Sequence, residues 1–359
     1  MDKGWDLLTN RTDLSDTRID EAPVPEVGDG EALLRVDRVG MTANNVTYAL
    51  TGDLLNYWSF FPAPEGWGRV PLWGFADVVA SNVDGVPTGE RFYGYLPPSS
   101  HLLVKPTDVS ERGFRDGSVH RAGLPGVYNN YQATATDESY ALPREDLQIL
   151  YKPLFATSFM LDDFLADNGY FDAGVAVLSS ASSKTAYGTA FCMRSRDEHP
   201  RIVGLTSAAN VEFTESLGCY DQVVSYEEVS SLPTDQPTIY VDVAGNTALR
   251  ETIHEHFGDS LRFDSVVGAT HHDTSFGSGD LAGPQPQFFF APDQMSKRRS
   301  DWGPGGLERT LGAAWSRFAP TVEGWVDVVE SKGPEGLRDA WLEVLSGKSD
   351  PRTGHVINL

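Results

Sequence analysis

Apolar and polar residues follow two different periods along this chain. The first third is rich in short segments with the two-residue alternation that is typical of half-buried β-strands. These segments lie at residues 31–39, 70–80, 91–96 and 101–104, and residues 45–50 have the pattern of a short helix. A region this rich in strands and turns predicts a compact domain like a partly closed β-barrel.

From residue 153 onward, helical and strand patterns alternate. Residues 153–168 carry apolar side chains on one helical face, and strands and helices follow in turn. Such alternation predicts an α/β fold with a doubly wound parallel sheet. The expected strands are 175–178, 201–205, 222–224, 239–243, 263–268 and 287–290, with a closing strand at 355–359; the expected helices begin at 184 and span 208–217, 247–257, 305–318 and 337–345.

Between the two regions, residues 111–147 show neither period. Structureless connections of this length are uncommon in compact domains unless they have a function. Residues 111–147 could therefore form a lid or a subunit-contact segment, or plain surface decoration, and the sequence leaves both open.

One stretch, residues 171–193, has the pattern of the first half of a nucleotide-binding βαβ unit. The apolar strand 175–178 is followed by small polar residues at 179–183 and by a helix that starts near Lys184. Small residues in such a turn let the backbone approach a pyrophosphate, which the helix N-terminus attracts. The usual glycines of G-x-G-x-x-G are absent, so the alternative is that these serines only cap a helix.

Charge and cysteine content narrow the function classes. Asp plus Glu number 51 against 28 Lys plus Arg, a formal net charge of −23, which disfavours binding to nucleic acid or anionic membranes. Cys192 and Cys219 lie in no C-x-x-C or Cys/His cluster, so we expect no structural zinc. The N-terminus lacks a signal-peptide core, and no apolar run reaches about 18 residues. We expect a cytoplasmic enzyme.

Several short motifs are informative in their order and spacing. They are PLWGFADVV at 71–79, GERFYG at 89–94, GCYDQVVSY at 218–226, YVDVAG at 240–245, and SGK at 346–348 followed by GHVI at 354–357. Together they resemble the medium-chain dehydrogenase/reductase superfamily, on its zinc-free quinone-oxidoreductase side. The resemblance implies a GroES-like β-barrel domain for substrate and catalysis, from residues 1–150 and 319–359. It also implies a Rossmann domain from 151–318 and a possible homodimer through that domain's edge strands.

The resemblance further implies that the altered turn binds a dinucleotide. An NAD site places Asp or Glu after the second strand to bind the ribose hydroxyls, and no acid follows 201–205 here. Neutral donors and Lys184 suit a 2′-phosphate, so we predict NADPH; the alternative is that Thr206 and Ser207 start a helix. The residues expected at the cofactor are Ser180, Ala181, Ser182, Ser183, Lys184, Thr185, Thr206, Ser207, Asn210, Tyr226, Val243, Ala244, Gly245, Gly268 and Thr270.

Zinc-free relatives bring an Asn and a Tyr to the substrate from the turn after the first long strand. The corresponding residues here are Asn44 or Asn45, and Tyr48. Tyr48 could donate a proton to a carbonyl oxygen or enolate, or pack in the core instead. His271 follows the strand 263–268 and is a candidate acid or base; a solvated loop histidine is the alternative. No catalytic metal is expected, because neither cysteine lies in the first third.

Aromatic residues suit a pocket for a small apolar or aromatic substrate, although a domain-interface core would use the same types. The candidates are Tyr57, Trp58, Tyr128 and Tyr131. We therefore predict an NADPH-dependent oxidoreductase that reduces an activated alkene, quinone or carbonyl. Two alternatives remain: the same fold performing non-hydride bond cleavage or elimination, or a non-catalytic binding protein on this scaffold.

Overall fold

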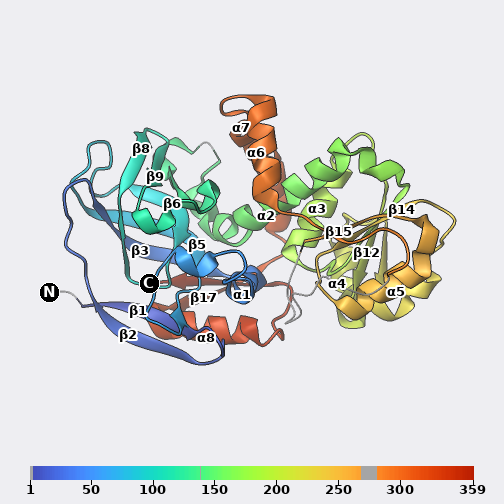
Figure 1. The fold of residues 1–359 in the computed structure, drawn as a ribbon, viewed down its shortest axis with the longest axis horizontal. Helices are drawn as coiled ribbons and strands as arrows, with labels where there is room; N and C mark the ends of the chain where they lie inside the picture. The colour runs from blue at the N-terminus through green and yellow to red at the C-terminus, as the bar shows by residue number, and fades with distance from the viewer. Residues whose placement is uncertain (1–2, 138, 268–280) are drawn as a thin grey trace. The chain divides into compact units, whose positions relative to one another are not determined.

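The computed structural model describes residues 3–137, 139–267 and 281–359. The chain forms two compact units (Figure 1): unit 1 is Met1–Leu150 with Val326–Leu359, and unit 2 is Tyr151–Trp325. Helix α2 (Glu145–Asp167) runs from unit 1 into unit 2. The chain returns to unit 1 after Trp325, seven residues later than the boundary expected from the sequence.

Unit 1 is built on a large, mostly antiparallel sheet with the strand order β17-β18-β3-β5-β6-β10-β9-β8, in which β7 also pairs with β3. The strands are β3 (Ala32–Met41), β5 (Leu72–Ser81), β6 (Arg91–Leu96), β7 (His101–Val104), β8 (Pro106–Ser110), β9 (Gly113–Asp116), β10 (Asn130–Ala133), β17 (Asp327–Lys332) and β18 (Thr353–Asn358). A second sheet has the order β2-β1-β4, from β1 (Lys3–Asn10), β2 (Thr17–Pro23) and β4 (Trp67–Gly68). Helices α1 (Ala43–Leu50) and α8 (Gly333–Leu345) complete the unit.

The segment 111–147 contains regular structure, which the sequence pattern did not predict. Strands β9 and β10 lie within it, and β10 pairs with both β6 and β9. Each strand is only four residues long, too short for an alternation to stand out. The segment therefore extends the main sheet of unit 1, and a role as a lid or subunit contact stays a prediction.

Unit 2 contains a six-stranded parallel sheet in the order β13-β12-β11-β14-β15-β16. Its strands are β11 (Val175–Leu178), β12 (Arg201–Thr206), β13 (Gln222–Ser225), β14 (Thr238–Asp242), β15 (Leu261–Val266) and β16 (Gln287–Phe288). Its other helices are α3 (Lys184–Arg194), α4 (Val211–Ser216), α5 (Thr247–Phe257), α6 (Ala291–Trp302) and α7 (Gly306–Val322). The predicted doubly wound parallel sheet is confirmed.

The strand order of this sheet reverses between β11 and β14, which are neighbours in space. All residues of both strands are buried, as expected for central strands covered on both faces. Ligands of open α/β sheets bind outside the carboxyl ends of the strands at such a reversal. The residues that follow Leu178 and Asp242 are therefore where a site is expected.

Within the described residues, no helix is long and apolar enough to cross a membrane.

Candidate functional site

A tight turn joins β11 to α3 at the strand reversal. The Ser183 N–H donates to the Ser180 carbonyl (2.7 Å), and the Ser183 hydroxyl caps α3 by accepting from the Ala186 N–H (3.3 Å). The first N–H groups of a helix have no partner inside it, and they form the positive end of its dipole. Ser183 therefore caps α3, as the alternative for these serines proposed, and the positive end of the α3 dipole lies at the carboxyl edge of the sheet.

Polar side chains from three elements meet beside this turn. The Thr206 hydroxyl, at the end of β12, donates to the Ser182 hydroxyl (3.2 Å), and the Asn210 amide donates to the same oxygen (3.3 Å). Ser207, which lies between these two residues in sequence, is half-buried. It directly precedes a 3₁₀ turn at Ala208–Asn210. The Lys184 ammonium lies 5.7 Å from the centre of the Tyr151 ring. The structure thus brings Thr206 and Asn210, two of the neutral donors that the sequence suggested for a 2′-phosphate, to the Ser182 hydroxyl.

Ser179 ties the two central strands together, a role that the sequence reading did not assign. Its hydroxyl donates to Asp242 Oδ1 (3.0 Å) and accepts from the N–H groups of Val243 and Ala244 (3.0 Å each). The Gly245 N–H donates to Asp242 Oδ1 as well (2.9 Å). The N–H groups of these predicted cofactor residues are therefore already hydrogen-bonded within the protein. A signal was present in the sequence, since Ser179 and Asp242 both stand at ends of buried strands.

A buried charged network lies next to this serine. Arg250, on α5, forms ion pairs with Asp242 and with Asp264 of β15 (3.5 Å to the latter). His254 Nε2 lies 2.9 Å from Asp264 Oδ2, and its Nδ1 lies 2.6 Å from the Ala282 carbonyl oxygen. Burial lowers the pKa of His254, but these two hydrogen bonds outweigh it, so the net pKa lies above the ordinary value. All four side chains are at most 4% exposed.

In unit 1, Tyr48 belongs to a buried aromatic cluster that also contains Tyr57, Phe60, Phe61, Tyr95 and Tyr128. The rings of Tyr48 and Tyr57 are 4.7 Å apart, and the hydroxyls of Tyr57 and Tyr128 are 3.1 Å apart. The Tyr48 hydroxyl accepts a hydrogen bond from Trp73 Nε1 (3.1 Å). Burial raises the pKa of Tyr48 well above its ordinary value, although hydrogen bonds with Trp73 and Asn44 lower it in part. The phenol is therefore protonated at neutral pH.

The two candidate asparagines on α1 have different surroundings. Asn44 is one helical turn before Tyr48, so both lie on one helix face, and Asn44 lies close enough to the phenol to lower its pKa in part. Asn45 instead caps the helix: its Oδ1 accepts from the Thr42 N–H (2.8 Å), and its amide donates to the Pro71 carbonyl (2.8 Å). Because both ends of the Asn45 amide are engaged, Asn44 is the better candidate partner of Tyr48.

The four predicted pocket residues divide between two clusters. Tyr57 and Tyr128 pack around Tyr48, whereas Trp58 and Tyr131 belong to the main core of unit 1. The Tyr131 hydroxyl donates to the Tyr95 carbonyl (2.7 Å), and Trp58 lies against Gly68, where an added Cβ would come within 2.5 Å of its ring. His271, Gly268 and Thr270 lie outside the described residues. Among the described residues, no group of His, Cys, Asp and Glu could hold a metal ion.

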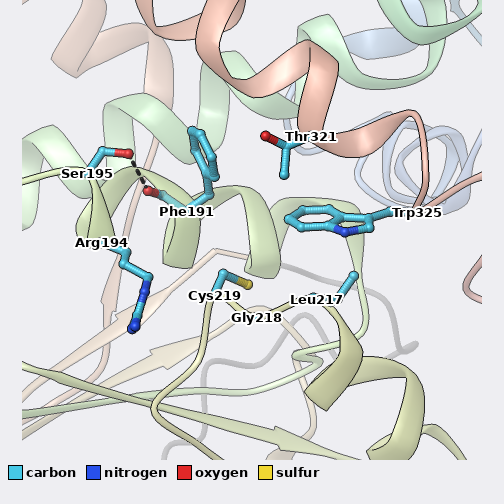
Figure 2. Close-up of a pocket in the computed structure, with 8 residues that line it drawn as sticks. All are labelled: Phe191, Arg194, Ser195, Leu217, Gly218, Cys219, Thr321 and Trp325. Atoms are coloured by element: carbon cyan, nitrogen blue, oxygen red, sulfur yellow. Dashed lines mark hydrogen bonds between the residues drawn. The ribbon is translucent and has the colours of Figure 1, made fainter.

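A separate pocket of about 220 Å³ lies in unit 2. It is lined by Phe191, Arg194, Ser195, Leu217, Gly218, Cys219, Thr321 and Trp325 (Figure 2). Arg194 pairs with Asp221 (2.8 Å), and the Ser195 hydroxyl donates to the Phe191 carbonyl (2.8 Å). None of these residues belongs to the turn or was predicted from the sequence, so the pocket contributes nothing to the candidate nucleotide site.

Comparison with solved structures gives matches over essentially the whole chain. CurA from Vibrio vulnificus in complex with NADPH is 12% identical with a TM-score of 0.60, covering 95% of this chain and 94% of that one. A mutant form of enoyl thioester reductase from Candida tropicalis is 12% identical with a TM-score of 0.56, covering 100% of both chains. The yhdH oxidoreductase from Salmonella enterica in complex with NADP is 13% identical with a TM-score of 0.54, covering 99% of both.

These likenesses confirm the two-domain fold expected from the resemblance to medium-chain dehydrogenase/reductases. No curated protein matches the chain by sequence. A family model, in contrast, matches residues 39–350, which is most of the chain. The chain therefore belongs to the family described as "Protein of unknown function (DUF2855)".

Proposed function

We propose that this protein is an NADPH-dependent, zinc-free oxidoreductase that reduces an activated alkene, quinone or carbonyl of a small apolar or aromatic substrate. The observation that carries the proposal is the turn at the β11/β14 reversal. It combines the N-terminus of α3 with the side chains of Thr206 and Asn210, which converge on the Ser182 hydroxyl, and no acid ends β12. Solved proteins of this fold include complexes with NADPH and NADP, which supports the same cofactor here.

The residues present fit a phosphorylated dinucleotide by their chemistry. The N-terminus of α3 offers backbone N–H groups to a pyrophosphate, and Lys184 at its first position adds a positive charge. Ser182, Thr206 and Asn210 supply neutral donors, where a carboxylate would repel a 2′-phosphate. When bound, NADPH would supply the hydride. No residue of this chain needs to act as a Lewis acid.

Tyr48 is the proposed proton donor to the anion that hydride addition leaves on the substrate. The phenol is protonated at neutral pH, so it carries a proton that a strongly basic anion can accept. The hydrogen bond that Trp73 donates to the phenol oxygen fixes the hydroxyl and stabilises negative charge on it. Asn44, one turn earlier on the same helix face, would orient the phenol.

The test of cofactor choice is a fluorescence titration of purified protein with NADPH and with NADH. We expect NADPH to bind at least about tenfold more tightly, a difference of ~1.4 kcal/mol. Asn210→Asp places a carboxylate in the donor cluster and should remove that preference by repelling the 2′-phosphate. Asn168→Asp, in the same unit but with its amide bonded to the Phe164 carbonyl, is the control and should bind as the wild type does.

Two results would overturn the proposal. The first is the lack of NADPH binding at near-millimolar concentration. The second is turnover of an added quinone or enone without any change in NADPH absorbance, which would indicate non-hydride chemistry on this fold.

A further inference from the structure

The cofactor turn takes an unusual backbone conformation without glycine. Ser180 has φ 49°, in the left-handed region that side chains with a Cβ rarely adopt. Glycine adopts this region at little cost, which is why glycines are usual in nucleotide-binding turns. Something other than local preference must therefore hold Ser180 in place.

Two tyrosines hydrogen-bond directly to the backbone of this turn. The Ser180 N–H donates to the Tyr226 hydroxyl (3.2 Å), and the Tyr220 hydroxyl donates to the Ala181 carbonyl (2.8 Å). The Ala181 N–H donates to the Leu205 carbonyl of the neighbouring strand (2.9 Å). The turn is thus held on both sides of the Ser180–Ala181 peptide by the phenol groups of two residues that flank β13 in sequence.

A glycine on the adjacent strand makes room for this arrangement. A Cβ at Gly204 would lie 2.8 Å from the Ala181 Cβ and 3.0 Å from the Tyr220 ring. Both phenols also stay protonated, since burial raises the pKa of Tyr220 and of Tyr226. The close approach of the turn, β12 and Tyr220 therefore depends on the small residues Gly204 and Ala181 as well as on Tyr220 itself.

We infer that Tyr220 and Tyr226 are positioning residues that hold the glycine-free turn in the conformation that receives the dinucleotide. The inference rests on the proposed function. Tyr226 engages the Ser180 N–H, so phosphate recognition falls to the first turn of α3 and to the Ser182 cluster. We call these two hydrogen bonds, from Tyr220 and Tyr226 to the turn, the clamp. The clamp holds Ser180 in a conformation that glycine would adopt at little cost. With glycine at 180, Tyr226 should therefore no longer be needed.

The test is a cycle of Tyr226→Phe, Ser180→Gly and the double variant, with NADPH affinity and steady-state kinetics as readouts. Tyr226→Phe should weaken NADPH binding about threefold to tenfold, the size expected for one hydrogen bond. It should raise KM for NADPH and leave kcat unchanged, because the turn touches no reacting atom. In the Ser180→Gly background the same change should have almost no effect, and Tyr220→Phe should resemble Tyr226→Phe.

Tyr170→Phe is the matched control, because it removes a phenol that is bonded to Asp162 (3.0 Å) in the same unit and does not touch the turn. It should leave NADPH affinity unchanged. If the wild type binds no NADPH, the proposed function fails and this inference fails with it. If the wild type binds but Tyr226→Phe binds equally well, or is equally impaired with glycine at 180, the clamp alone is overturned.

Discussion

Replacement of Arg250 by methionine is expected to lower the free energy of unfolding by about 3–5 kcal/mol, because it takes the arginine cation away from two buried carboxylates. Asp242 and Asp264 are both fully buried, and Arg250 is 4% exposed. Arg250 is ion-paired to both carboxylates, so the substitution leaves Asp242 without a cation and Asp264 with His254 as its remaining partner. The measurement is urea unfolding followed by circular dichroism.

The matched control is Arg194→Met, also in unit 2. Arg194 pairs with Asp221 at 2.8 Å, but their side chains are 47% and 30% exposed. Solvent stabilises both charges there, so the cost should stay below about 1 kcal/mol. Equal losses for the two variants would show that the Asp242–Arg250–Asp264 network is not held by its ion pairs.

The Arg250 variant should also weaken NADPH binding, since Asp242 accepts the hydrogen bond of Ser179 at the strand reversal.

The second large effect is expected at Tyr48. Given the proposed function, Tyr48→Phe should lower kcat by about 10²–10⁴-fold, the usual contribution of a general acid. The ring would remain packed against Tyr57 and Tyr95, so the loss would come from the hydroxyl. The measurement is NADPH oxidation with the best substrate from a panel of quinones, enones and aldehydes. NADPH affinity should not change, because Tyr48 lies in unit 1 and the proposed cofactor residues lie in unit 2.

Tyr93→Phe is the control for this substitution. Tyr93 stacks on Trp73, with ring centres 5.6 Å apart, and its hydroxyl lies 3.5 Å from the Gln148 carbonyl. Loss of this hydroxyl removes a phenol from the same aromatic surroundings without touching the Tyr48 oxygen, and kcat should change little. If Tyr48→Phe lowers kcat by less than about tenfold, the activation free energy rises by less than ~1.4 kcal/mol. That result would contradict the assignment of Tyr48 as proton donor.

Elements whose stability comes from their own burial pattern could be predicted from the sequence. Strands β11 and β14 are runs of buried residues, and β3 buries most of its residues. Strand β17 could not be predicted, because nearly all of its residues are exposed. Its extended conformation is stabilised by parallel pairing with β18. Helix α6 is strongly polar; ion pairs of Lys297 and Arg298 with Asp167 of α2 help to hold it. Local periodicity carries no information about such partners.

The same division holds for the candidate site. The sequence by itself determined where the turn lies, that no acid follows β12, and that Tyr48 lies within a short helix after the first long strand. Only the tertiary structure decided that Asn45 caps α1 while Asn44 contacts Tyr48, and that Ser182, Thr206 and Asn210 converge. It alone placed Tyr220 and Tyr226 on the turn. Spacing along the chain specifies neighbours within one element, whereas strand order and register decide which distant side chains meet at the edge of a sheet.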